Sequence, residues 1–270
     1  MPHHLMPNIF GACFSGQIIV LDVIRDRYVV LSHGQSAAVA PYLGLDSASF
    51  EANVASNTSI LQKLIEAHLV TEQTFPAVDP KLNSVSPSPQ TGGMSANGWK
   101  LADNAFEHRP AWRWIIRAML DLRAVHKHAT KQGLAGVLQL CSQAIGQNEL
   151  HFAQTEEYMP FVNALNWACL FYPKPTKCLE WSAALTLVCA RAGLASKLLI
   201  GVQSFPFYAH AWSETDHAII GDSALRRKEL SVILEFPTSL LELPYDRSRH
   251  RLSHNTGIFN AKPGLGFNSR

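Results

Sequence analysis

The fold of this chain is decided by residues 173–193, PKPTKCLEWSAALTLVCARAG. Pro175 disfavours a helix at the residue before it, and Thr176 is of a type that caps helix N-termini. The stretch that follows is rich in Ala and Leu, and Gly193 is a typical helix stop. We therefore predict a helix from Cys178 to Ala192, with the Cys178 thiol in its first turn.

A thiol at a helix start has two interpretations. The partial positive charge of the helix N-terminus favours the thiolate, which is the nucleophilic form of cysteine. A free cysteine is also one of the most frequently buried side chains, and it then acts as a small hydrophobe. The residues that follow the helix favour the first interpretation.

Three short strands are predicted after this helix. The apolar run ASKLLIGV (195–202) indicates the first strand, and Phe205-Pro206 ends it. In the next strand, YAHAWSE (208–214), alternate side chains share one face, namely Tyr208, His210, Trp212 and Glu214. A turn then leads into the return strand AIIGD (218–222).

The strand register predicts which carboxylate meets His210. If the turn leaves three residues unpaired, Asp222 lies directly opposite His210, with Cβ atoms roughly 4.5–5.5 Å apart. A two-residue turn would move Asp222 to the other face of the sheet, so this prediction requires an odd loop or a compensating bulge. Glu214 shares the face of His210 and is the competing carboxylate, but the geometry favours Asp222.

The three residues together suit one kind of chemistry. A thiol, an imidazole and a carboxylate are the parts of a cysteine nucleophile that is activated by a histidine base. Asp222 would fix the tautomer of His210 and stabilise its imidazolium form, and the other ring nitrogen would serve Cys178. Cys178, His210 and Asp222 are therefore our candidate catalytic residues.

The signatures around these residues resemble the transglutaminase-like B protein of lasso-peptide maturation. The resemblance covers roughly residues 176–236. It is carried by Cys178-Leu-x-x-Ser-x-Ala-Leu185, Gly193, Ile200-Gly-Val202, Pro206-Phe-x-Ala-His-Ala-Trp-x-Glu214, Asp222 and Leu230-Ser-Val-Ile-Leu-Glu235. Ser213 departs from the pattern, which has an apolar residue there, but it faces away from His210.

The resemblance implies a papain-like cysteine peptidase that cuts a precursor peptide and frees the amine of its core segment. An ATP-dependent cyclase would be the partner that uses this amine to close a ring. Cys178 would be the nucleophile, His210 the base and then the acid, and Asp222 the orienting group, with no cofactor or metal. The backbone N–H of Cys178 is the natural oxyanion donor. Two alternatives remain open: a cross-linking transglutaminase with the same trio, and a scaffold that delivers the precursor and has a vestigial thiol.

Residues 1–75 are predicted to form a separate winged-helix-like module. Strands are expected at 9–14, 16–22 and 28–31, and helices at 36–40 and 58–68. The module resembles, less specifically, the peptide-recognition element of modified-peptide pathways, in which a leader peptide adds a strand to an exposed sheet edge. The alternative is a structural wing that packs on the peptidase.

The remaining segments complete an α+β fold. Residues 76–100 carry many Pro, Gly and Ser residues and indicate a linker. Within the peptidase domain, 101–236, helices at 105–127, 133–149 and 161–171 are expected to wrap the catalytic helix. Residues 237–270 are predicted to be an extension with a mobile tail, in which the basic run 247–251 is a solvated segment.

Composition excludes several other classes. The net charge of +2 is close to neutral, which disfavours a nucleic-acid partner. Five cysteines without C-x-x-C spacing argue against a zinc site and a disulfide framework, and suit the reducing cytoplasm. No apolar run reaches the ~20 residues of a membrane span, no signal peptide is visible, and no phosphate-binding loop implies ATP.

Overall fold

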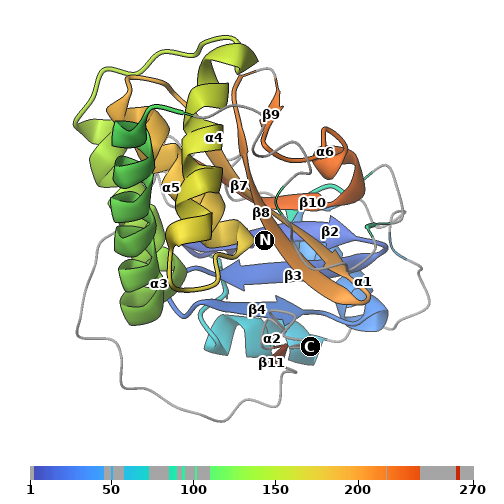
Figure 1. Ribbon diagram of the computed structural model, residues 1–270. Helices are drawn as coiled ribbons and strands as arrows, with labels where there is room; N and C mark the ends of the chain where they lie inside the picture. Colours follow the sequence, from blue (N-terminus) through green and yellow to red (C-terminus); the bar gives the residue numbers. More distant parts are fainter. Residues whose placement is uncertain are drawn as a thin grey trace.

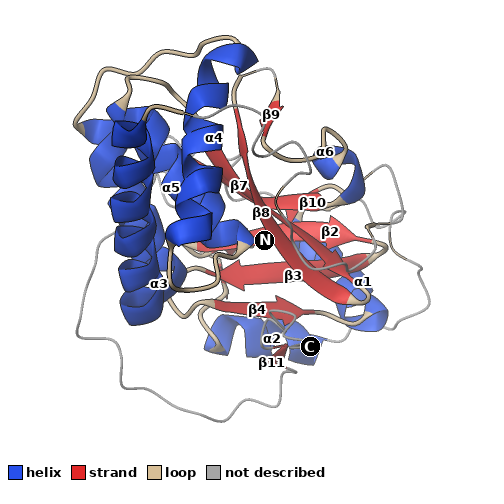
Figure 2. Cartoon of the chain, in the orientation of Figure 1, coloured by secondary structure: helices blue, strands red, loops and turns tan. Residues whose placement is uncertain are grey.

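The structure is a computed structural model that describes residues 3–45, 50, 58–72, 85–89, 93–94, 101, 110–216, 218–237 and 260–261. These residues form a fold of both helices and strands, which confirms the predicted α+β class (Figure 2). The basic run, 247–251, most of the predicted linker, 76–100, and the predicted tail apart from residues 260–261 lie outside the described residues.

The N-terminal part is built on an antiparallel meander of three strands, β2 (Ile9–Phe14), β3 (Gln17–Asp22) and β4 (Arg27–Val30). Two helices follow, α1 (His33–Val39) and α2 (Thr58–Glu66), with a 3-10 turn, η1 (Ala40–Leu43), after α1. Two short strands, β1 (His4–Leu5) and β5 (Val70–Thr71), pair and close this part. Helix α1 begins three residues before the predicted start because Ser32 and Gln35 form a capping box that starts it earlier.

Both outer strands of the meander have a short partner strand. Strand β6 (Val85–Ser86), inside the predicted linker, pairs with β2 in parallel, and β11 (Asn260–Ala261) pairs with β4 in antiparallel orientation. The exposed edge expected from the resemblance is therefore covered over two residues on each side of the meander. Each partner strand covers two residues of its neighbour, because a two-residue strand has no more backbone groups to pair.

The second part combines three helices and a four-stranded sheet. The helices are α3 (Trp112–Gly146), α4 (Thr155–Phe171) and α5 (Cys178–Arg191). The sheet has the order β10-β7-β8-β9, made of β7 (Lys197–Ser204), β8 (Phe207–Glu214), β9 (Ile219–Ile220) and β10 (Ser231–Phe236), and a short helix α6 (Arg226–Glu229) precedes β10. Figure 1 shows α3, α4 and α5 gathered on one side of this sheet.

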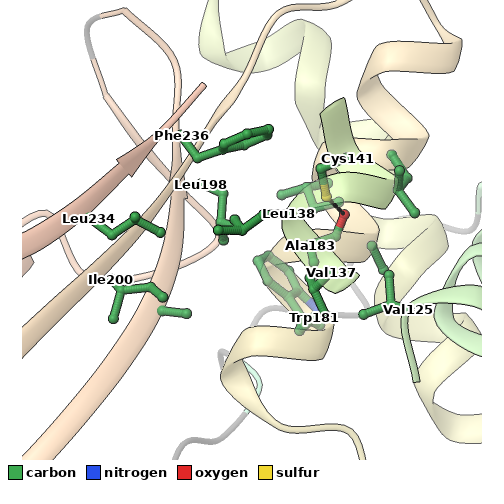
Figure 3. Packing of buried hydrophobic residues seen from close by; sticks show 14 of the residues in the cluster. Val125, Val137, Leu138, Cys141, Trp181, Ala183, Leu198, Ile200, Leu234 and Phe236 are labelled. Carbon is green, nitrogen blue, oxygen red and sulfur yellow. Dashed lines mark hydrogen bonds between the residues drawn. The ribbon is translucent and has the colours of Figure 1, made fainter. Parts of the chain in front are cut away.

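Two of the predicted helices are joined in α3. Its backbone leaves helical geometry at Gly133 (φ 62°, ψ −152°), so the predicted pair is present as two halves with a kink instead of a loop. Helix α5 belongs to the main core and packs on α3 and α4 and on the strands β8 and β7. Figure 3 shows Leu138 and Trp181 from these helices facing Leu198 and Phe236 from the strands.

The two parts of the molecule share this core. Phe14, Leu21 and Tyr28 of the first sheet belong to the same buried cluster as the side chains of α3, α5 and β7. The opposite face of that sheet packs on α1 and α2 in a cluster of its own. Asp26, in the turn between β3 and β4, accepts a hydrogen bond from the backbone N–H of Leu134, just after the kink in α3. The N-terminal part is therefore packed directly against the helices of the second part.

Candidate active site

Cys178 is the first residue of helix α5. The N-cap is Lys177, whose side chain makes no capping bond, so the predicted cap at Thr176 is wrong by one residue. The thiol is half-buried, whereas Cys13, Cys141 and Cys189 are fully buried. All five cysteines are free thiols.

The other four cysteines have protonated thiols near neutral pH. Burial raises the pKa of Cys13 and of Cys169 to about 11 and that of Cys141 to about 12, and burial also raises the pKa of Cys189. A thiol with a raised pKa is a poor nucleophile, because the thiolate is the reactive form. These four side chains are therefore structural, and Cys178 remains as the candidate nucleophile.

Two buried hydrogen bonds fix α5 against β8, the strand that carries His210. The Ser182 hydroxyl donates to the carbonyl of Ala211 at 3.1 Å. The Ser213 hydroxyl donates to the carbonyl of Ser182 at 3.2 Å. Ser213, the residue that departs from the family pattern, thus helps to hold the helix of Cys178 beside the strand of His210.

His210 and Asp222 are joined by a short hydrogen bond. The His210 Nε2 atom lies 2.6 Å from Asp222 Oδ2, and His210 is 1% exposed. A carboxylate only accepts hydrogen bonds, so Nε2 carries the proton and Nδ1 is left for another group. Within the described part of the chain, Nδ1 is buried and has no hydrogen-bond partner of good geometry.

The route by which Asp222 reaches His210 differs from the prediction. Strand β9 pairs Ser213 with Ile220 and Glu214 with Ile219, so the loop has four residues, 215–218, and the register is shifted by one from the predicted one. In that register a continued strand would carry Asp222 to the wrong face. The strand ends instead at Ile220, and Gly221 adopts a left-handed backbone (φ +67°) that turns the chain back toward His210.

Electrostatics in this site favour the imidazolium form of His210. Burial alone would lower the pKa of His210, but the Asp222 carboxylate and the Cys178 thiolate outweigh burial and raise it to about 9. Burial would raise the pKa of Asp222, but the bond to His210 and the Arg226 guanidinium hold it below its usual value. The charge of Cys178 thus acts on His210 from α5, and the charge of Asp222 acts on it from the opposite ring nitrogen.

The aromatic neighbours of His210 lie along β8, as the alternation predicted. The His210 ring is stacked with Tyr208 and with Trp212, each at a centroid distance of 6.1 Å. Burial, with a contribution from the Cys178 thiolate, raises the pKa of Tyr208 to about 12, so its phenol is neutral. Glu214, the competing carboxylate, accepts hydrogen bonds from Trp212 Nε1 at 2.7 Å and from Arg227, and does not contact His210.

Tyr28 brings the first sheet to this site. Its ring lies 5.3 Å from that of Phe207 at the start of β8, and the side chain is 7% exposed. Burial raises the pKa of Tyr28, and the charges of Asp26 and Cys178 raise it further. Tyr28 of β4 therefore belongs to the same core cluster that the candidate nucleophile packs against, which the sequence did not predict.

Sequence reasoning also missed Arg226. Its Nε atom donates to Asp222 Oδ1 at 2.8 Å. A basic residue four positions after a candidate carboxylate is the signal that could have found it, since that is the spacing of one helical turn. The charged stretch ALRRKE gave no other indication.

The described part of the chain contains neither a metal-binding cluster nor a membrane-spanning helix. Among the residues from 110 to 237 and the described N-terminal segments, no group of three or more His, Cys, Asp or Glu side chains is placed to hold a metal ion. None of the helices in the described ranges is long and apolar enough to span a bilayer.

Comparisons with known proteins agree with this architecture. A family profile described as the transglutaminase-like superfamily matches residues 112–235. The chain is also 33% identical over 86 residues to the microcin J25-processing protein McjB of Escherichia coli, a match that covers 31% of this chain and 41% of that protein. No solved structure matches this chain. The two matches confirm the resemblance to lasso-peptide B proteins that the sequence signatures carried.

Proposed function

We propose that this chain, whose residues 112–235 form a transglutaminase-like domain, is a cysteine peptidase that removes the leader from a lasso-peptide precursor. The observation that carries the proposal is the 2.6 Å bond between His210 and Asp222, which leaves Nδ1 of a buried imidazole available to the thiol at the start of α5. The match to a microcin-processing protein supports a peptide precursor as the substrate.

The geometry supports acyl transfer in two steps. In the first, Nδ1 of His210 already holds the proton of the Cys178 thiol, and Sγ attacks the scissile carbonyl as the thiolate. The C–N bond then breaks, His210 returns the proton to the core amine, and the leader stays on Cys178 as a thioester. In the second step His210, now neutral, takes a proton from water, which attacks the thioester. The C–S bond breaks, the leader leaves with a free carboxylate, and the pair of Cys178 thiolate and His210 imidazolium is restored.

Backbone and carboxylate groups assist both steps. The N–H of Cys178 lies at the first position of α5, where a helix leaves its N–H groups without intrahelical partners. It is therefore the donor we assign to the oxyanion of each tetrahedral intermediate. Asp222 stabilises the imidazolium form of His210 in both steps, as the raised pKa of His210, about 9, indicates.

The N-terminal part is the proposed site of leader recognition. An extended peptide binds by adding a strand to a sheet edge, and β4 is an outer strand of the meander, paired only to the two residues of β11 on that side within the described structure. Strand β4 also carries Tyr28, which belongs to the core cluster that Cys178 packs against. A leader on β4 would thus be held next to the nucleophile.

The cytoplasmic partner that receives the freed core amine would be an ATP-dependent cyclase.

The test is incubation of the full chain with a candidate precursor encoded near its gene, followed by mass spectrometry. We expect two fragments, a leader with a free carboxylate and a core with a free amine, and no cleavage with Cys178→Ala. A cross-linked product lighter by one ammonia would identify a transglutaminase instead. Maturation that proceeds unchanged with Cys178→Ala would leave the chain as a delivery scaffold.

A further inference from the structure

The Asp222 carboxylate has a second set of partners besides His210. Its Oδ2 atom bonds the imidazole, and its Oδ1 atom accepts hydrogen bonds from the backbone N–H of Ser223 at 2.6 Å and from Arg226 Nε at 2.8 Å. The two oxygens are thus divided between the catalytic imidazole and a separate anchor. The direction of Oδ2 depends on what holds Oδ1.

The anchoring guanidinium is itself held in place. Arg226 Nη1 donates to Glu229 Oε2 at 2.9 Å and lies 3.6 Å from the sulfur of Met94. The Arg226 side chain is 17% exposed, and that of Asp222 is 8% exposed. The ion pair of Arg226 and Asp222 is shielded from water, so it stabilises the charged carboxylate more than an exposed pair at the same distance would.

We infer that Arg226 is a positioning residue that keeps Asp222 ionised and aims its Oδ2 atom at His210. This inference deepens the proposed peptidase function and rests on it. The titratable groups that face Asp222 are His210 and Tyr208 of β8 and Arg226 of α6, and Cys178 of α5 acts through the imidazole. Arg226 is the cation of this set that stays charged at every relevant pH.

Replacing Arg226 with an uncharged residue should change how the reactivity of the Cys178 thiol depends on pH at the acid end of its profile. A cation within hydrogen-bond distance lowers the pKa of an aspartate by roughly 1–3 units. Without it Asp222 takes up a proton at a higher pH, and the protonated carboxyl no longer stabilises the imidazolium that faces the Cys178 thiolate. The thiol then becomes less reactive at a pH where the unmodified protein is still active.

The experiment measures the alkylation rate of Cys178 by iodoacetamide against pH in the full chain, with the modified cysteine identified by peptide mass spectrometry. It requires no precursor, so its outcome is independent of whether the protein cleaves a leader. In Arg226→Gln we expect the acid limb to move up by about one pH unit. Arg226→Lys should restore at least half of that shift, because the positive charge returns.

Two further variants make the result specific. Arg227→Gln is the matched control, since the neighbouring Arg227 pairs with Glu214 and Glu235, and its acid limb should equal that of the unmodified chain. Glu229→Gln loosens Arg226 without touching Asp222 and should give a smaller shift in the same direction, which preserves the test if Arg226→Gln does not fold. An unmoved acid limb in Arg226→Gln, or equal shifts in the Gln and Lys variants, would overturn the inference.

Discussion

The variant Gly221→Ala tests whether the left-handed turn at this residue positions Asp222 for its bond to His210. Gly221 has φ +67°, where an L-residue costs about 1–2 kcal/mol. A Cβ atom at this position would overlap one carbon of the Trp181 indole and lie 3.1 and 3.3 Å from two others. Trp181 is 2% exposed and its Nε1 donates to Asn166 at 3.0 Å, so the ring has no room to yield.

The expected loss of stability follows from these two terms. The backbone penalty and an overpacking penalty of about 1–3 kcal/mol together lower the free energy of unfolding by about 2–5 kcal/mol. Gly44→Ala is the matched control, because Gly44 has φ +70° and a Cβ there would meet nothing within 4 Å. The control should therefore lose the backbone penalty alone, about 1–2 kcal/mol.

The assay is urea unfolding followed by tryptophan fluorescence, combined with cleavage kinetics under conditions where each variant is folded. Because relief of the Trp181 contact moves the turn, we expect the kcat/KM of Gly221→Ala to fall about a hundredfold, as for a misplacement of ~1 Å. Gly44→Ala should keep the cleavage rate of the unmodified chain. Equal destabilisation of the two variants, with cleavage intact in both, would refute this account of the turn.

Three more outcomes are expected. The pKa of His210 is raised to about 9. The kcat/KM for cleavage should therefore fall as the pH rises through 9 and His210 loses its proton. In a pH–rate profile of Asp222→Asn, this fall should occur at lower pH. A chain that ends at residue 258 lacks β11, so the outer edge of β4 has no partner strand there. A fluorescent leader peptide should then bind with a lower Kd. An unchanged Kd would place the leader elsewhere. Ser182→Ala loses the bond to Ala211 and should lower the free energy of unfolding by about 1–2 kcal/mol, which thermal melting would measure.

Local patterns predicted the parts of the candidate site that depend on near neighbours in the chain. The helix beginning at Cys178 was predicted from Ala and Leu content and a terminal glycine, and it is present as α5. The shared face of Tyr208, His210 and Trp212 was predicted from alternation in one strand, and the stacked rings confirm it. Both features depend on residues that lie fewer than twenty positions apart in the chain.

The features that the sequence did not predict depend on contacts between distant segments or on one backbone angle. The register argument assumed that the return strand continues to Asp222, but the left-handed turn at Gly221 replaces that strand and cannot be derived from alternation. The core cluster that holds Tyr28 and Cys178 joins residues far apart in the chain, and Asp26 bonds to Leu134 beside the kink in α3 in the same way. The core that the N-terminal part shares with α3, α5 and β7 is a further contact of this kind.

One measurement tests directly whether the Cys178 sulfur carries the leader during the reaction. The full chain is mixed with precursor, quenched in acid within the first turnover, digested and examined by mass spectrometry for the acylated peptide. We predict that the leader is found on the peptide containing Cys178 and that the adduct is missing from Cys178→Ala. Cleavage at the normal rate by Cys178→Ala, or a leader adduct on another residue, would contradict the assignment.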